Sequence, residues 1–128
     1  MKIVRPISIE EMKLNIFRYK DFPVVMGISS KWLIRKSNFY GLFLNNNLIG
    51  IARLCIKDNK AKLKLIEIKG KYQNQGYGSY FLKELENIAI KNNCNQICLC
   101  PRDYRVYDFY TQNGYNYIHE HLMIKKII

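Results

Sequence analysis

Residues 66–79 read I-E-I-K-G-K-Y-Q-N-Q-G-Y-G-S, and three structural signals follow one another in this segment. Ile66 and Ile68 alternate with Glu67 as in a β-strand, and three glycines interrupt the polar run that comes next. An amphipathic helical pattern begins after Ser79. The first N–H groups of a helix have no internal partner and carry partial positive charge, so a strand, a glycine-rich turn and a helix start suit a phosphate group.

The spacing of the glycines excludes two common phosphate-binding loops. A Walker loop needs Lys and then Ser or Thr after its second Gly, whereas Tyr77 and Gly78 follow Gly76. A dinucleotide-binding fingerprint needs a third Gly three residues after the second, where this chain has Phe81. Neither a P-loop nor a Rossmann turn is therefore expected.

The turn 73–78, Q-N-Q-G-Y-G, resembles the pattern Q/R-x-x-G-x-G/A with which the GNAT superfamily of N-acetyltransferases holds the pyrophosphate of acetyl-CoA. The resemblance implies that backbone N–H groups of residues 73–79 meet the pyrophosphate, and that the pantetheine arm pairs along residues 68–70 like an added strand. The cofactor-binding residues implied here are Ile68, Lys69, Gly70, Gln73, Asn74, Gln75, Gly76, Tyr77, Gly78 and Ser79. A glycine-rich helix cap without a ligand is the alternative for so short a motif.

A helix and then a strand are predicted after this turn. The apolar face of the helix consists of Phe81, Leu82, Leu85, Ile88 and Ala89. Its polar face consists of Lys83, Glu84, Glu86 and Asn87. Asn92-Asn93 ends the helix, and a strand from Gln96 to Cys100 ends at Pro101. A right-handed crossover of this kind implies a parallel pair of strands within a mixed sheet.

Three antiparallel strands are predicted before the turn, at residues 39–44, 48–56 and 61–68. Asn45-Asn46-Asn47 joins the first two, because Asn tolerates the positive φ values of a tight hairpin. In the third strand Ile66 follows Leu65 directly, so the apolar alternation slips by one residue. Such a slip is typical of a β-bulge, which bends a strand and opens a gap beside its neighbour. Burial on both faces is the alternative explanation.

The N-terminal third predicts a strand and two helices. Lys2 to Arg5 forms a short strand that Pro6 ends, and Ser8-Ile9-Glu10-Glu11 is a capping box for a helix over residues 9–19. Ser29 or Ser30 caps a shorter helix that carries Trp32. In an acetyltransferase this region would flank the acceptor site, and a core position for Trp32 is the alternative.

The segment 103–115, D-Y-R-V-Y-D-F-Y-T-Q-N-G-Y, is similar to a second GNAT pattern, N-x-x-A-x-x-F/L-Y-x-x-x-G-F/Y. The resemblance implies that Tyr110 is the general acid at the CoA sulfur and that Gly114 ends a helix before a final strand. It also implies that Asp103 is a cofactor-binding residue, in the place of the family's Asn that binds the cofactor arm, although Asp has no N–H to donate. Val106 replaces a small Ala. A core aromatic is the alternative role for Tyr110.

Glu67 is the candidate general base, since the amine must lose a proton when it attacks the thioester. A solvent-facing role remains open for Glu67 if the bulge is absent. His119 and His121 are placed on one face of a last strand over residues 117–124. Without a third ligand in view they are surface or acceptor-pocket residues, and we expect no metal.

The composition indicates which kinds of partner and which cellular location are expected. The net charge is +11, from 21 Lys and Arg against 10 Asp and Glu, and this favours anionic partners. No apolar run is long enough for a membrane span, and the N-terminus lacks the apolar region of a secretory signal, so a cytoplasmic protein is expected. The four cysteines, Cys55, Cys94, Cys98 and Cys100, are interpreted as reduced core thiols, with a cysteine nucleophile as the alternative.

Together the two motifs predict a single α/β GNAT-like domain over residues 1–128, with a mixed sheet of about six to seven strands flanked by helices. The implied activity is transfer of acetyl from acetyl-CoA, a co-substrate, to an amine by direct attack. Small-molecule, nucleotide-linked amino-sugar and protein amines all remain open as acceptors, and a homodimer is compatible with the sequence. Because fold does not fix function, an inactive acyl-CoA-binding or nucleic-acid-binding module is the alternative. No membrane partner is expected, and nucleic acid is the less favoured partner.

Overall fold

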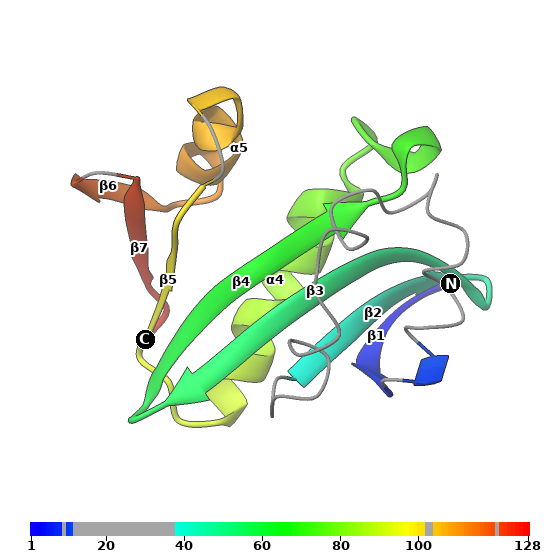
Figure 1. Ribbon diagram of the computed structural model, residues 1–128, viewed down its shortest axis with the longest axis horizontal. Helices are drawn as coiled ribbons and strands as arrows, with labels where there is room; N and C mark the ends of the chain where they lie inside the picture. Colours follow the sequence, from blue (N-terminus) through cyan, green and yellow to red (C-terminus); the bar gives the residue numbers. More distant parts are fainter. Residues whose placement is uncertain (9, 12–37, 102–103, 120) are drawn as a thin grey trace.

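The computed structural model describes residues 1–8, 10–11, 38–101, 104–119 and 121–128 (Figure 1). The strands are β1 (Lys2–Ile7), β2 (Asn38–Leu44), β3 (Asn47–Lys57), β4 (Lys60–Ile68), β5 (Gln96–Leu99), β6 (Asn116–His119) and β7 (Leu122–Lys126). The helices are α4 (Tyr77–Lys91) and α5 (Tyr107–Gln112), each preceded by a 3-10 turn, η1 (Gly70–Tyr72) and η2 (Tyr104–Val106).

The strands form one mixed sheet in the order β1-β2-β3-β4-β5-β7-β6. Every neighbouring pair is antiparallel except β4 and β5, which α4 connects as a parallel crossover. The predicted α/β class and the predicted mixed sheet of about six to seven strands are thereby confirmed, and the sheet has seven. No helix in the part of the chain that the structure describes is long and apolar enough to cross a membrane.

Two tight turns set the register of β2, β3 and β4. Asn45 and Asn46 have φ values of 49° and 71°, and Asp58 and Asn59 have 53° and 62°. Asn and Asp tolerate this left-handed region better than other non-glycine residues, and two successive positive φ values match the right-handed twist of a hairpin. The predicted Asn hairpin is confirmed.

The predicted end of the first strand at Pro6 is wrong. Pro6 lies inside β1 and pairs with Tyr40. β1 is the edge strand of the sheet, and proline is tolerated there because its missing N–H can face away from the ladder. The capping box is present: Ser8 Oγ accepts from Glu11 N at 3.0 Å, and Glu11 Oε1 accepts from Ser8 N at 3.4 Å. The predictions for Ser29, Ser30 and Trp32, and for most of the helix over 9–19, lie outside the described residues.

A one-residue bulge separates the two halves of β4. Arg53 of β3 pairs with Leu65, but the next residue, Leu54, pairs with Leu63, so Lys64 is the extra residue. The parallel pairing of β4 with β5 also ends at Leu63. Beyond this point the two strands diverge (Figure 1), which confirms the bulge that the phase slip predicted.

Helix α4 packs across one face of the sheet and supplies much of the core. Phe81, Leu82, Leu85 and Ala89 are fully buried against residues of β3, β4 and β5. Burying a side chain of this size stabilises the fold by roughly 1.5–3 kcal/mol. Glu86 is also buried, so its predicted position on the polar face of the helix is wrong. Cys94 lies in the core as expected, whereas Cys100 is exposed.

The C-terminal tail forms a hairpin, and the prediction of one strand over 117–124 is wrong. β6 ends at His119, and His121 has a φ of 71°, which turns the chain back into β7. His119 then pairs with Leu122 across the turn. The sequence pattern could not locate this reversal because neither Gly nor Pro marks it.

Candidate active site

A pocket of about 520 Å³ opens where β4 and β5 diverge. Three elements surround it: the end of β4, the turn leading into α4, and the segment formed by η2 and α5. Its lining residues are Ile66, Glu67, Ile68, Gln73, Asn74, Gly76, Gly78, Ser79, Arg105, Val106, Phe109 and Tyr110. The bulge and the divergence of the strands thus bring the two GNAT-like motifs together around one cavity.

The start of α4 forms one wall of this pocket, through Gly76, Gly78 and Ser79. Gly76 is the N-cap of α4 with a φ of 87°, and the first intrahelical bond runs from Tyr80 N to Gly76 O at 3.1 Å. The N–H groups of Tyr77, Gly78 and Ser79 therefore precede the helical ladder, and among the described side chains none caps this end. A helix start of this kind favours negative charge because its N–H dipoles point outward.

Two glutamine side chains stabilise the turn itself. Gln73 Nε2 donates to the carbonyl oxygen of Ile68 at 2.8 Å, and Gln75 Nε2 donates to that of Lys71 at 2.9 Å. Lys69 N donates to Ile49 O on β3 at 2.8 Å, which fixes the end of β4. The polar side chains of the motif thus shape the backbone that surrounds the pocket.

Tyr110, in the middle of α5, lines the pocket from the other motif. Its side chain is 9% exposed and packs edge-on against Phe109 and Tyr115, with ring centroids 5.1 and 5.8 Å away. Burial raises the pKa of Tyr110 from 10.0 to about 12. The phenol therefore keeps its proton at neutral and moderately alkaline pH and is available as a donor.

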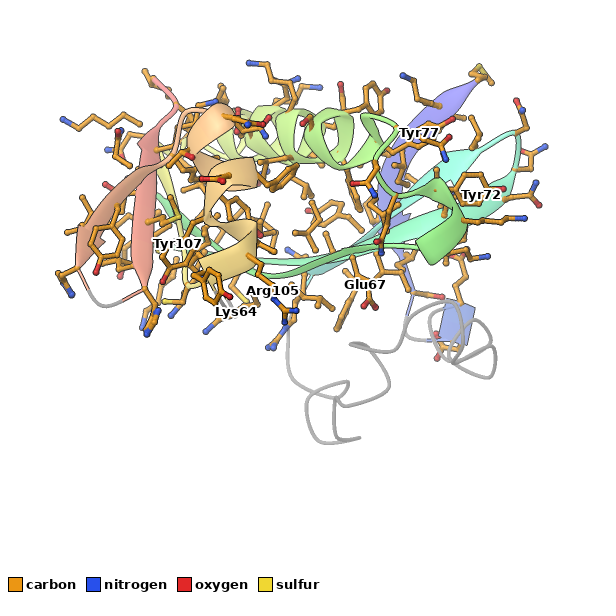
Figure 2. All side chains as sticks on the ribbon, turned by 90° about the horizontal axis from the view of Figure 1, so that it is seen from above. Lys64, Glu67, Tyr72, Tyr77, Arg105 and Tyr107 are labelled. Atoms are coloured by element: carbon orange, nitrogen blue, oxygen red, sulfur yellow. The ribbon has the colours of Figure 1, made fainter. Side chains whose placement is uncertain are left out.

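Glu67 lies beyond the bulge on β4, opposite Ile51 of β3. Figure 2 shows its side chain leaving the sheet on the side away from α4, toward the same side as Lys64 and Arg105. It is partly buried and lines the pocket that Tyr110 also lines. A carboxylate and a phenol therefore border one cavity from different elements.

A buried polar network joins α4 to the segment that carries Tyr110. Glu86 is 3% exposed and accepts from Tyr115 OH at 3.1 Å and from Lys125 Nζ at 3.0 Å. Lys125 also donates to Asn113 O at 2.9 Å. The Glu86 carboxylate and desolvation of the phenol raise the pKa of Tyr115, with desolvation the larger cause. Tyr115 N donates to Tyr110 O at 3.0 Å, so the network reaches the backbone of the candidate acid.

The structure brings together most of the predicted site residues. The predicted residues that line the pocket are Glu67, Ile68, Gln73, Asn74, Gly76, Gly78, Ser79 and Tyr110. Lys69, Gly70, Gln75 and Tyr77 are neighbours in the chain that do not line it, and Asp103 lies outside the described residues. The sequence prediction missed four lining residues, Ile66, Arg105, Val106 and Phe109, although the last three lie inside the second motif.

The histidines are not part of this pocket. His121 Nδ1 shares a hydrogen bond of 2.5 Å with the hydroxyl of Tyr107, and Figure 2 shows Tyr107 on the side of the sheet away from α4. Within the described ranges, no three side chains of His, Cys, Asp or Glu lie close enough together to hold a metal ion.

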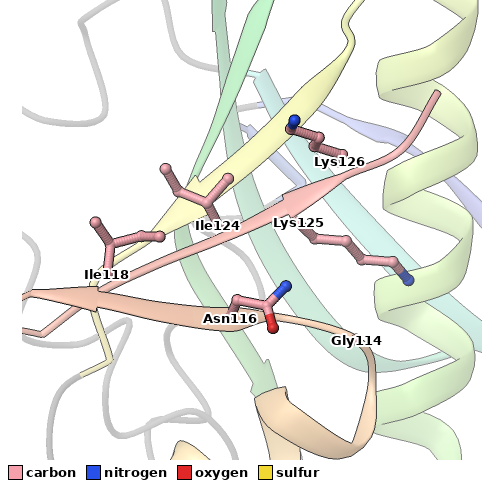
Figure 3. A pocket seen from close by; sticks show the side chains of 6 residues that line it. All are labelled: Gly114, Asn116, Ile118, Ile124, Lys125 and Lys126. Atoms are coloured by element: carbon pink, nitrogen blue, oxygen red, sulfur yellow. The ribbon is translucent and has the colours of Figure 1, made fainter.

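A second pocket of about 300 Å³ lies on the C-terminal hairpin (Figure 3). It is lined by Gly114, Asn116, Ile118, Ile124, Lys125 and Lys126. None of these residues belongs to either GNAT-like wall of the larger pocket, so the convergence of a carboxylate, a phenol and open N–H groups identifies the larger pocket as the candidate active site.

Comparison with known proteins gives a family and a fold. Residues 8–115 match the family described as the Acetyltransferase (GNAT) family. A search of curated proteins by sequence gives no significant match.

Solved structures similar to this chain include a PaiA N-acetyltransferase from Thermoplasma acidophilum in complex with coenzyme A, at 23% identity and a TM-score of 0.75, covering 98% of this chain and 99% of that one. The ribosomal-protein-S18-alanine N-acetyltransferase from Escherichia coli matches at 16% identity and a TM-score of 0.81, with 99% and 94% covered. The N-acetylglutamate synthase from Neisseria gonorrhoeae, complexed with coenzyme A and N-acetyl-glutamate, matches at 15% identity and a TM-score of 0.79, with 100% and 35% covered. Because all three sequence identities are below 25%, the similarity to these structures shows a shared fold alone.

Proposed function

The chain belongs to the GNAT acetyltransferase family, and we propose that it transfers the acetyl group of acetyl-CoA to an amine. The observation that carries the proposal is that the start of α4, Glu67 and Tyr110 all border the same pocket, the larger of the two described above. These groups meet the three needs of the reaction, which are a site for phosphate, a proton acceptor and a donor for the leaving group.

In this proposal the pyrophosphate of acetyl-CoA binds at the start of α4. The backbone N–H groups of residues 77–79 donate to it at the helix start that follows Gly76, whose φ is 87°, and Gly76, Gly78 and Ser79 line the pocket. The pantetheine arm runs along residues 68–70 in the gap between β4 and β5. The carbonyl oxygen of Ile68 already accepts a hydrogen bond from Gln73. An N–H of the pantetheine arm would therefore donate to the second lone pair of the same oxygen.

The chemistry begins when the lone pair of a neutral amine attacks the thioester carbonyl and forms a carbon–nitrogen bond. The nitrogen loses a proton to Glu67, directly or through one water, as the tetrahedral intermediate forms and collapses. Collapse breaks the carbon–sulfur bond and releases CoA as a thiolate. The products are the amide and CoA, and no metal is needed for any step.

Tyr110 stabilises the leaving sulfur. A phenol whose pKa is about 12 holds its proton more tightly than a thiol, whose ordinary pKa is about 8.5. Tyr110 therefore acts mainly by donating a hydrogen bond to the sulfur as negative charge develops there. Complete transfer of the phenol proton to the sulfur would be the extreme form of the same interaction.

Two measurements on the purified protein test the proposal. Calorimetric titration with acetyl-CoA tests binding, and acetyl-CoA-dependent release of free thiol with a panel of amines tests turnover. We expect saturable binding and release of thiol that depends on the amine. Binding without turnover by any amine would favour the inactive acyl-CoA-binding module instead.

Replacing Glu67 tests the proton acceptor. We expect Glu67→Gln to lower the rate of acetyl transfer most at low pH, where more of the amine is protonated and a base matters most. Glu84→Gln on the side of α4 is the matched control, because it removes the same charge outside the pocket. A pH–rate profile of Glu67→Gln identical to that of the wild type would remove Glu67 from the mechanism.

A further inference from the structure

Exposed lysines gather on the face of the sheet that α4 does not cover. Lys57 of β3 pairs with Lys60 of β4, Lys60 with Gln96 of β5, and Gln96 with Lys126 of β7. These four positions form one row across four neighbouring strands. Figure 3 shows Lys125 directed toward α4 and Lys126 leaving β7 on the other side.

Two further lysines extend the row along β4. Inward-facing Ala61 and Leu63 alternate with exposed Lys62 and Lys64, and Figure 2 shows Lys64 on the side away from α4. We name the set Lys57, Lys60, Lys62, Lys64 and Lys126 the basic face; all five side chains are exposed.

The basic face places like charges at neighbouring positions. Lys57 and Lys60 lie directly opposite each other in an antiparallel pair, an arrangement that destabilises a sheet when both carry the same charge. The pKa of Lys64 is lowered, first by partial desolvation and then by the charge of Lys62 and, more weakly, by that of Arg53. A bound anion would reduce this repulsion, so binding of a negatively charged partner is favoured at this face.

The basic face adjoins the candidate active site along β4. Glu67 and Lys64 are three residues apart, or roughly 10 Å at the rise of a strand, and Lys60 lies roughly 23 Å from Glu67. Arg105 lines the pocket and points to the same side as Lys64 and Glu67 (Figure 2). An acceptor bound at the pocket could therefore contact several lysines only if it were an extended molecule.

We propose that the acceptor is a polypeptide whose acidic segment docks on the basic face and whose amine enters the pocket beside Glu67. This inference rests on the proposed acetyl transfer. An extended chain advances roughly 3.3–3.6 Å per residue, so acidic side chains about three to seven residues from the amine meet Lys64 through Lys60. Electrostatic complementarity of this kind mainly sets specificity and the rate of association.

Three features favour a polypeptide over other anions. A polypeptide carries the aliphatic amine that the reaction needs, at its N-terminus or on lysine, whereas the bases of nucleic acids do not. The distance from Glu67 to Lys60 exceeds the reach of a small phosphorylated amine. The strand residues between the lysines on the same face are Cys55, Cys98 and Ile124, so the strands place no aromatic ring among the lysines for stacking bases, and Tyr107 on the same side belongs to α5 outside this row.

A binding experiment tests the surface without relying on catalysis. The probe is a fluorescent peptide with a free N-terminal Ala and Glu at about positions 3 to 7, compared with the same peptide carrying Gln. We expect Lys62→Gln/Lys64→Gln to weaken binding of the acidic peptide about fivefold or more at low salt and to leave the Gln peptide unaffected. Lys83→Gln/Lys91→Gln is the matched control, since it removes two exposed lysines from α4.

Equal binding of the Glu and Gln peptides, or an equal loss in the α4 control, would overturn the proposal. A single-stranded oligonucleotide of the same charge is the third probe. If it binds more tightly than the acidic peptide and depends on the same two lysines, nucleic acid is the ligand and the proposal fails.

A turnover experiment separates this inference from the proposed function. We expect kcat/KM for acetylation of the Glu peptide to exceed that of the Gln peptide about fivefold or more, with the advantage lost in Lys62→Gln/Lys64→Gln or at high salt. Acetylation of both peptides at equal rates would overturn the inference and leave the transferase intact. Failure of acetyl-CoA to bind would instead refute the proposed function, because peptide binding is measured without the co-substrate.

Discussion

Helix α4 contributes to the protein in two different ways along its length. At its N-terminus, Gly76, Gly78 and Ser79 line the pocket, and no side chain in the described part of the chain caps the first backbone N–H groups of the helix. Near its middle, Glu86 is buried and holds Tyr115 and Lys125 through its carboxylate. The N-terminal end, here the open end, uses the main chain, and the region around Glu86, here the closed region, uses side chains that contact one another.

This difference decides what each region tolerates. The open end depends on the conformation of Gly76 and on nothing packed against it, since a Cβ added there would meet no atom within 4 Å. The closed region depends on partners far apart in sequence, because Glu86 lies 29 residues from Tyr115 and 39 from Lys125. Changes at the open end should therefore alter ligand binding, and changes at the closed region should alter stability.

Tyr110 lies between the two regions, and its replacement gives the largest expected effect. Tyr110→Phe keeps the ring that packs on Phe109 and Tyr115 and removes the only hydrogen-bond donor of a side chain that lines the pocket. We expect kcat to fall roughly 10²-fold, the low end of general acid catalysis, while acetyl-CoA affinity stays within about threefold. Steady-state rates and calorimetry on the same preparation measure both quantities.

Tyr107→Phe is the matched control for this variant, because it removes a phenol from the same helix outside the pocket. An undiminished kcat in correctly folded Tyr110→Phe would leave Tyr110 as a core aromatic.

Glu86 gives the next largest effect, and it should appear in stability. Glu86→Leu leaves Tyr115 OH and Lys125 Nζ without their carboxylate in a region where Lys125 is 24% exposed. Breaking a buried pair costs roughly 3–5 kcal/mol, and the partial exposure of Lys125 reduces the expected loss to about 2–3 kcal/mol. Urea unfolding measures the free energy, with Glu84→Leu as the surface control. A loss no larger than that of the control would show that the network contributes little to stability.

The open end could be predicted from the sequence because its signals are local. Glycine spacing, the slip from Leu65 to Ile66 and the Asn turns each act within a few residues, and the structure confirms the bulge and the hairpin. The second motif led in the same way to Tyr110 in the pocket.

The closed region could not be predicted because its partners meet only after folding. Glu86 has the spacing of a solvent-facing residue, and only the docking of β7 and of the segment after α5 makes its burial favourable. The chain reversal at His121 could not be predicted for a related reason. It is determined by the pairing of β7 with β5, and no Gly or Pro marks the turn in the sequence.

Gly76 offers a smaller effect that is confined to the open end. Gly76→Val introduces a β-branched side chain at a φ of 87° and at the edge of the pocket. We expect acetyl-CoA affinity to fall about tenfold, because the turn is strained and the ligand cannot approach the backbone closely. Calorimetric titration of folded protein measures the change.

Gly76→Asn separates the two causes, because Asn tolerates positive φ but still adds a side chain. An equal loss in both variants assigns the effect to close approach of the ligand, and a loss in Val alone assigns it to backbone strain. Unchanged affinity in both would contradict the assignment of this loop to the pyrophosphate.

The smallest expected effect concerns alkaline stability and involves the region where Tyr110 is buried. The unfolded chain releases the Tyr110 proton with a pKa of 10.0, whereas the folded protein holds it to about 12. The folded state thus binds more protons between these values, and the stability that the neutral phenol contributes is complete below pH 10 and lost as the pH rises through 12. By about pH 11 this difference in pKa predicts that the wild type loses about 1.4 kcal/mol of its free energy of unfolding, a loss that Tyr110→Phe does not show.

Urea unfolding of both proteins at about pH 8 and pH 11 measures this difference directly, because the lysines and the remaining tyrosines titrate in both. Parallel losses in the two proteins would mean that the phenol of Tyr110 is solvated, and its described position between Phe109 and Tyr115 would then not hold in solution.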